Sequence, residues 1–77
     1  MDDAEIHRTI TELVAEERDL RTQSDHSEEQ GARLRRLEES LDQCWDLLRQ
    51  RDALRDAGAD PGAAKPRPVT EVEEYLQ

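Results

Sequence analysis

The chain has 77 residues, 40% of them charged and 34% hydrophobic, and its formal net charge at pH 7 is −9. A chain of this length forms one small domain at most, whose single core is only marginally stable without a partner. The negative charge excludes nucleic acid and an anionic membrane from the expected partners, because both would repel the chain.

The first predicted element is a helix at about residues 3–23. Asp2 and Asp3 are both good N-cap residues, and acidic side chains in a first turn favour the positive end of the helix dipole. Glu17 stands in the apolar stripe of this helix, where it either specifies the register or bends outward to an arginine. Val14 widens the stripe. The stripe itself recurs at helical spacing and consists of Ile6, Ile10, Leu13 and Leu20.

A turn is predicted at about residues 24–27. The stretch from Thr22 to Glu29 has no apolar side chain and clusters serine, aspartate and histidine, which is typical of a turn. Ser27, followed three residues later by Gln30, forms a capping box that marks the start of a new helix. One unbroken helix through this region is the alternative.

A second, longer helix is predicted at about residues 27–57. It ends at Gly58, a good C-cap residue that a proline follows shortly. Three apolar side chains, Trp45, Leu47 and Leu54, lie off its main stripe. The second half of the helix therefore presents a broader apolar surface than the first helix can cover. The main stripe comprises Leu34, Leu37, Leu41, Cys44 and Leu48.

The two stripes predict the fold class, which is all-α: an antiparallel two-helix hairpin with coiled-coil-like packing. Facing residues have numbers that add up to 54, and Glu17 against Leu37 is the one flawed layer. The remaining layers pair Leu20 with Leu34, Leu13 with Leu41, Ile10 with Cys44 and Ile6 with Leu48.

All three prolines fall within residues 59–68, so this segment is predicted to be an irregular, extended linker. Residues 69–77 regain helical signals, with a capping box from Thr70 to Glu73. A helix this short is not stable alone in water, so it should dock on the second half of the long helix or on a partner chain. Its apolar face consists of Val69, Val72, Tyr75 and Leu76.

The hairpin alone leaves apolar side chains uncovered, which predicts self-association. Pairing two hairpins into a dimeric four-helix bundle buries these side chains, and two-fold pairing is the commonest way to do so. The expected partner is a second copy of the chain. A larger protein that docks on Trp45 and the carboxy-terminal segment is the alternative. The predicted interface residues are Val14, Trp45, Leu47, Leu54, Val72, Tyr75 and Leu76.

No residue pattern predicts a catalytic, cofactor or metal site, so a non-enzymatic interaction or regulatory module is the expected function. Cys44, the single cysteine, is expected to pack as a small hydrophobe whose pKa Asp42 and Asp46 raise. A small thiol-dependent enzyme or redox carrier is the alternative. Glu38, Asp42 and Asp46 form a carboxylate ladder that is predicted to be a solvated face. The two histidines fall on different segments, without the spacing of a zinc or di-iron site.

The chain is expected to stay in the cytoplasm and off membranes. It has no run of about 18 or more apolar residues, so nothing predicts a membrane span. Its first ten residues are acidic, where a secretory signal would be basic and then apolar. A single cysteine rules out an internal disulfide framework, which suits a reducing compartment.

Several stretches also resemble a known family. The run LDQCWDLLRQR at residues 41–51, the later DPG segment and the VEEYLQ ending resemble the DUF2630 family of short actinobacterial proteins of unknown function. The resemblance extends to the pattern D-x-x-I-x-x-x-I-x-x-L-V-A-E-E at residues 3–17 and departs mainly in the turn. It implies a bacterial, cytoplasmic protein without an assigned activity, and it transfers no catalytic residues.

Overall fold

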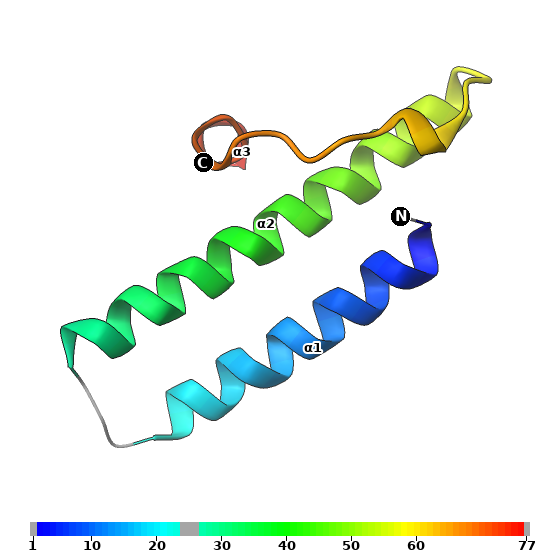
Figure 1. Ribbon diagram of the computed structural model, residues 1–77. Coiled ribbons are helices and arrows are strands. Elements are labelled where there is room, and N and C mark those ends of the chain that lie inside the picture. Colours follow the sequence, from blue (N-terminus) through cyan, green and yellow to red (C-terminus); the bar gives the residue numbers. More distant parts are fainter. Residues whose placement is uncertain (1, 24–26, 77) are drawn as a thin grey trace.

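The computed structural model describes residues 2–23 and 27–76, the last three of these by their backbone alone. α1 and α2 lie antiparallel, side by side, and the chain after α2 turns back along another side of α2 (Figure 1). We call residues 59–76 the tail. The described part is all-helical, as predicted, and its elements are α1 (Asp3–Thr22), α2 (Glu28–Asp56), the single 3₁₀ turn η1 (Pro61–Ala63) and α3 (Val69–Leu76).

α1 begins where the sequence predicts, because Asp2 caps it. The Asp2 carboxylate accepts a hydrogen bond from the backbone N–H of Glu5 at 2.8 Å. That bond satisfies one of the amides that a helix start leaves unpaired. The apolar stripe faces the interior, and its buried members are Ile6, Ile10 and Leu20.

α2 begins at the predicted capping residue. The Ser27 hydroxyl accepts a hydrogen bond from the backbone N–H of Gln30 at 3.2 Å. Residues 24–26, which make up the rest of the predicted turn, lie outside the described residues. The start of the second helix is therefore fixed by local side-chain chemistry.

α2 ends at a glycine that adopts a left-handed backbone conformation. Gly58 has a φ of +74°, a region that a side chain would strain. Its N–H donates to the carbonyl oxygen of Arg55, and the N–H of Ala59 donates to that of Leu54. This pair of hydrogen bonds is a Schellman motif, which stops the helix and turns the chain back toward α2.

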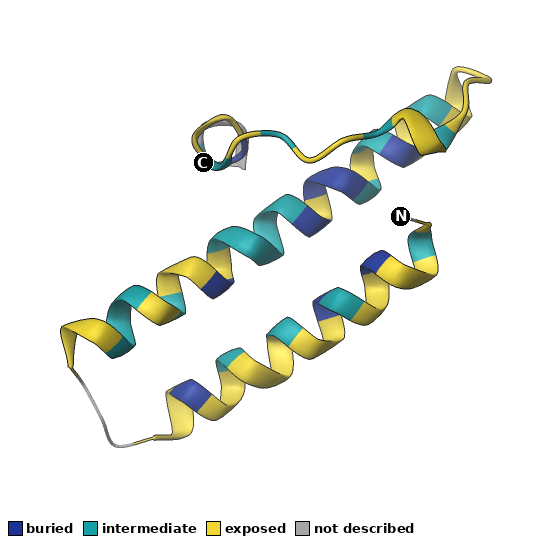
Figure 2. Ribbon diagram, in the orientation of Figure 1, coloured by how far each residue is buried: buried dark blue, intermediate teal, exposed yellow. Residues whose placement is uncertain are grey.

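The core lies in the seam between α1 and α2, where the two helices turn buried residues toward each other (Figure 2). Ile10 and Cys44, a pair predicted to face each other, both belong to its central cluster. The cluster follows the predicted register, because both members of two further predicted pairs lie in it or against it. Those pairs are Ile6 with Leu48 and Leu13 with Leu41.

Ion pairs flank this seam. Arg21 bonds to Glu38 at 2.9 Å, and Arg33 lies 3.5 Å from Glu16, in both cases between exposed side chains. Exposed pairs of this kind contribute only about 0.2 to 1 kcal/mol each. Glu17, the polar member of the α1 stripe, lies 3.7 Å from Arg21. It thus takes the outward arrangement, one of the two that the sequence left open.

The tail corrects the prediction that Leu47 is left uncovered by its own chain. Leu47 is only 8% exposed and belongs to the core cluster, with Ala64 of the tail packed against that cluster. Ile6, Arg51 and Pro66 line a small cavity together with these two residues. The part of α2 that α1 does not cover is therefore covered by the returning chain.

Polar contacts to backbone carbonyl groups fasten the tail along α2. The Gln50 side chain donates to the carbonyl oxygen of Lys65 at 2.9 Å, and that of Gln43 donates to the carbonyl oxygen of Arg67 at 3.0 Å. Irregular backbone needs such partners where it lies against a helix. The sequence allowed the tail to dock on its own chain or on a partner, and the structure shows the first arrangement.

α3 docks through Val72, which is fully buried. The helix begins at Val69, because the Pro68 carbonyl oxygen accepts from the N–H groups of Glu71 and Val72. Thr70 lies inside the helix and is not its N-cap, which corrects the predicted capping box. Proline at the preceding position supplies the fixed backbone angle that starts the first turn.

Candidate functional site

One large apolar side chain of the hairpin stays exposed beside a histidine. Trp45 is 45% exposed and Val14 is 37% exposed, and they are the exposed large hydrophobic residues of the part of the chain that the structure describes. The His7 ring meets the indole edge-on, with 6.4 Å between ring centroids and 79° between ring planes. His7 and Val14, seven residues apart, share one side of α1. We call the surface of His7, Val14 and Trp45 the tryptophan face.

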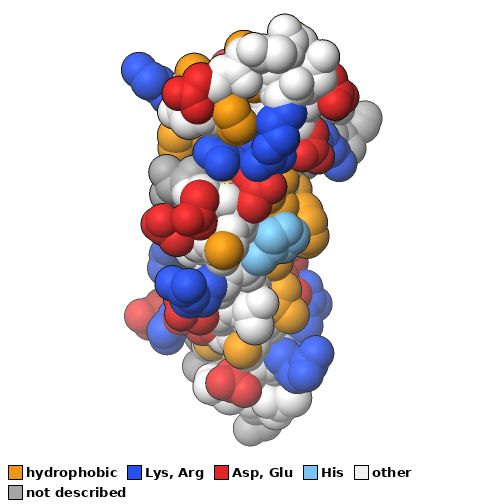
Figure 3. All heavy atoms as spheres, turned by 90° about the vertical axis from the view of Figure 1, so that its right-hand side faces the viewer, with side chains coloured by type: hydrophobic (Ala, Val, Ile, Leu, Met, Phe, Trp, Pro, Cys, Tyr) orange, Lys and Arg blue, Asp and Glu red, His pale blue; other side chains and the backbone are white. Residues whose placement is uncertain are grey.

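An open groove runs beside the indole at the end of the hairpin where α1 begins. Figure 3 views the molecule from the right-hand side of Figure 1 and shows a histidine beside hydrophobic side chains, with acidic and basic side chains around them. An apolar centre with a charged rim is typical of protein interfaces. The groove is lined by Asp3, His7, Trp45, Leu48, Arg49 and Asp52.

Helical rotation explains why Trp45 stays outside the core. Cys44 belongs to the cluster between α1 and α2, and each further residue turns the side-chain direction by about 100°. Asp46 and Leu47 are buried where the tail lies. Trp45 falls between these two directions, on a side of α2 that neither α1 nor the tail covers.

The structure separates the residues predicted to form an interface. Leu47 and Val72 are buried within the chain, and Leu54 is half-buried in a groove that the tail also lines. The side chains of Tyr75 and Leu76 lie outside the described ones. Val14 and Trp45 of the tryptophan face are therefore the predicted interface residues that stay exposed, and their role stays a prediction.

Asp46 corrects the prediction of a solvated carboxylate ladder. Its side chain is fully buried and forms an ion pair with Arg67 of the tail. The Arg67 Nε donates to one Asp46 oxygen at 2.9 Å, and the side chain of Gln50 donates to the same oxygen at 2.9 Å. The hydrogen bond from Arg67 lowers the pKa of Asp46 below its usual value, so the carboxylate stays ionised in the interior. Asp46 thus anchors the tail.

The remaining carboxylates of the ladder meet a further acidic residue of α3. A hydrogen bond shared with Asp42 raises the pKa of Glu73 above its usual value, and the charges of Asp42, Glu39 and Glu38 raise it further. Ionised Glu73 is therefore repelled by the surface on which α3 docks. Glu38 itself is exposed, as predicted for a solvated face.

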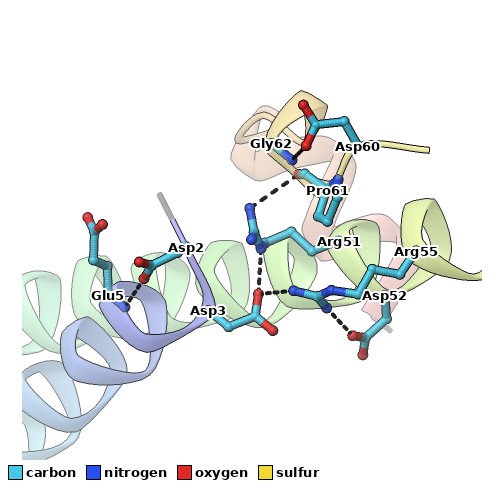
Figure 4. A network of polar contacts seen from close by, with 9 residues as sticks. All are labelled: Asp2, Asp3, Glu5, Arg51, Asp52, Arg55, Asp60, Pro61 and Gly62. Atoms are coloured by element: carbon cyan, nitrogen blue, oxygen red, sulfur yellow. Dashed lines mark hydrogen bonds and ion pairs between the residues drawn. The ribbon is translucent and has the colours of Figure 1, made fainter. Parts of the chain in front are cut away.

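An ion-pair cluster at the open end of the hairpin joins three segments (Figure 4). The Arg51 Nε donates to the Asp3 carboxylate, which also lies 2.7 Å from the guanidinium of Arg55. A second nitrogen of Arg51 donates to the Pro61 carbonyl oxygen at 3.2 Å. The hydrogen bonds from Arg55 and Arg51 lower the pKa of Asp3, and Asp3 raises that of Arg55. The sequence showed Asp3 only as a possible cap.

Cys44 is a packed core residue. It is 9% exposed, and burial raises the pKa of its thiol. The expected contribution of Asp42 and Asp46 is not the cause, because burial accounts for the shift and Asp46 is neutralised by Arg67. A thiol of raised pKa that solvent barely reaches is a poor nucleophile and a poor metal ligand.

No group of three or more His, Cys, Asp or Glu side chains in residues 2–23 and 27–73 could hold a metal ion. No helix of the described chain is long and apolar enough to span a membrane.

Comparison with known proteins identifies the family. The model of the family described as "Protein of unknown function (DUF2630)" matches residues 2–77. The chain belongs to this family. Uncharacterized proteins of Mycobacterium bovis and of two strains of Mycobacterium tuberculosis are each 55% identical to it over 78 residues, which covers 95% of this chain and 88% of each relative. No solved structure matches the chain. The resemblance to DUF2630 seen in the sequence is confirmed.

Proposed function

We propose that this DUF2630 protein is a non-enzymatic interaction module that self-associates through the tryptophan face, so that two hairpins form a four-helix bundle. The observation that supports the proposal is the contrast between the two sides of α2 that α1 does not cover: the tail covers one of them and leaves the other exposed. The tail buries Leu47 and Val72, yet it leaves Trp45 and Val14 open. A second copy would cover what the tail does not.

The apolar area sets the expected strength of this association. The exposed part of the indole is on the order of 100 Å², and burying it contributes about 2 to 3 kcal/mol. A two-fold dimer counts this contribution twice. Association itself costs about 4 to 15 kcal/mol, so two indoles alone do not hold a dimer. Val14 and the charged rim must contribute, and we expect a dissociation constant in the micromolar range.

Sedimentation equilibrium of the intact chain at about 1 to 100 micromolar tests the proposal. The wild-type chain should dimerise, and Trp45→Ser should raise the dissociation constant by more than about 100-fold while the helix content stays the same. Leu54→Ala is the matched control, because it truncates an apolar residue of α2 on the side of the tail. A wild-type chain that stays a folded monomer throughout this range would overturn the proposal.

A further inference from the structure

The side of α2 that carries Trp45 is a continuous stripe of mostly charged residues. Its members are spaced three, four, three, four and three residues apart, the spacing of a coiled-coil seam. α1 and the tail pack against neighbouring sides of the helix and reach its edges: Glu38 pairs with Arg21 of α1 at 2.9 Å, and Asp42 shares a hydrogen bond with Glu73 of α3. Asp42 is half-buried and the other members are exposed. The stripe consists of Arg35, Glu38, Asp42, Trp45, Arg49 and Asp52.

We infer that this stripe pairs with itself: α2 packs antiparallel against α2 of a second copy, about a two-fold axis level with the bond between Gln43 and Cys44. The inference rests on the proposed function and adds the surface, the orientation and the register of the dimer. Facing residues then have numbers that add up to 87. The layers, each present twice, are Arg35 with Asp52, Glu38 with Arg49 and Asp42 with Trp45.

Charge complementarity selects this arrangement over its neighbours. Two of the three layers pair opposite charges, and the indole N–H of Trp45 can donate to the Asp42 carboxylate of the second copy. A parallel two-fold pairing sets every residue opposite its own copy, so each charged layer would repel. An antiparallel pairing shifted by one heptad sets Asp42 against Glu38 or against Asp52, which also places like charges together.

The position of Val14 supports the same axis independently. The ion pair of Asp3 with Arg51 and the core both show that facing residues of α1 and α2 have numbers adding up to about 54, which places Val14 level with Ser40. The two-fold axis places Ser40, and with it Val14, level with Leu47 of the second copy. His7 lies at this level and Trp45 within two residues of it, about 3 Å along the helix. In this register each exposed apolar residue lies level with the tryptophan face of the other copy.

Disulfide cross-linking tests the orientation directly. The double variant Arg35→Cys with Asp52→Cys should form a covalent dimer under mild oxidation, because the two new thiols face each other across the seam. Each single variant should not, since the two copies of one position lie about 25 Å apart along an antiparallel seam. The wild-type chain, whose Cys44 is buried, is the control for background oxidation.

The outcomes distinguish the two proposals. Cross-linking of the double variant alone supports the antiparallel register. Cross-linking of a single variant overturns it in favour of a parallel pair. A dimer by sedimentation that no variant cross-links overturns the register and leaves self-association standing, whereas a wild-type monomer overturns both.

Charge reversal provides a second test by sedimentation. Arg35→Glu should raise the dimer dissociation constant at least about fivefold, and adding Asp52→Arg should restore it, because each reversed layer occurs twice. Arg36→Glu is the matched control, since Arg36 is an exposed neighbour that points to another side of α2. Equal losses from both arginine variants, or a double variant no better than the single, would contradict the register.

Discussion

Trp45 and Asp46 are neighbours in the sequence, yet the indole is 45% exposed and the carboxylate is fully buried. The difference comes from what covers each side of α2. The tail brings Arg67 into a hydrogen bond with Asp46, which also accepts one from Gln50 of α2, whereas Trp45 meets the edge of the His7 ring and is left 45% exposed. Burial in this small protein is decided by where the returning chain lies, and only secondarily by the polarity of the residue.

The largest effect on this contrast is expected from Leu47→Ala. Removing a buried leucine from the tail side should lower the free energy of unfolding by about 2 to 4 kcal/mol, because it leaves a cavity that the hairpin cannot close. Chemical denaturation followed by circular dichroism measures the change. Leu54→Ala, at a half-buried position, should cost clearly less. Equal losses at the two positions would show that the tail does not bury Leu47.

Asp46→Asn comes next and removes the buried anchor of the tail. We expect a loss of about 1 to 3 kcal/mol in the free energy of unfolding, less than for a fully enclosed pair, because the Arg67 side chain is 36% exposed. In the Asp46→Asn background, Arg67→Gln should cost almost no further stability, because its partner is already gone. The double variant should therefore be as stable as the Asp46→Asn variant. Additive losses in this double-mutant cycle would contradict the ion pair.

The same anchor has a defined pH dependence. Because the pKa of Asp46 in the folded chain lies below its usual value of 3.8, its contribution to stability is complete above that value. The contribution should be lost as the pH falls through the lowered pKa. Wild-type and Asp46→Asn chains should therefore converge in stability as the pH falls from 3.8 through the lowered pKa, as thermal unfolding at several pH values would show.

Trp45→Ser should lower the free energy of unfolding of the single chain by less than Leu47→Ala does, because 45% of the indole is already exposed to solvent. Its main effect is expected on association. Denaturation at a concentration well below the dimer dissociation constant isolates the first quantity. A loss comparable to that of Leu47→Ala would mean that the indole belongs to the core and would weaken the contrast.

Glu73→Gln should give the smallest change, and it should stabilise the chain. The pKa of Glu73 is raised above its usual value of 4.5, so the folded chain gains stability when this group is protonated and loses that gain as the pH rises through the raised pKa. Glutamine removes the repulsion by Asp42 at neutral pH. The melting temperature of the variant should exceed that of the wild type at pH 7, and the difference should vanish below pH 4.5.

Local chemistry explains which parts of this fold the sequence predicted. The capping hydroxyl of Ser27 and the left-handed Gly58 fix the ends of α2, and their signals lie within a few residues of where they act. The helical stripes fix the seam and its register in the same way. The predictions therefore hold for the two helices that pack together.

The tail contacts could not be predicted, because their partners lie far apart in the chain. Asp46 meets Arg67, which follows 21 positions later, and two of the three prolines lie between them. No periodicity links the two positions. The burial of Leu47 depends on the same return of the chain. Helical spacing correctly predicts that Trp45 lies off the main stripe. It also predicts a solvent-exposed Asp46, because nothing in the sequence indicates where the tail returns.

Arg51 couples the packing of α1 to the docking of the tail. One nitrogen of its side chain bonds to Asp3, 48 residues earlier, and another bonds to Pro61 in the tail. One guanidinium thus holds both α1 and the tail against α2, so a change at Asp3 is felt at Pro61 as well.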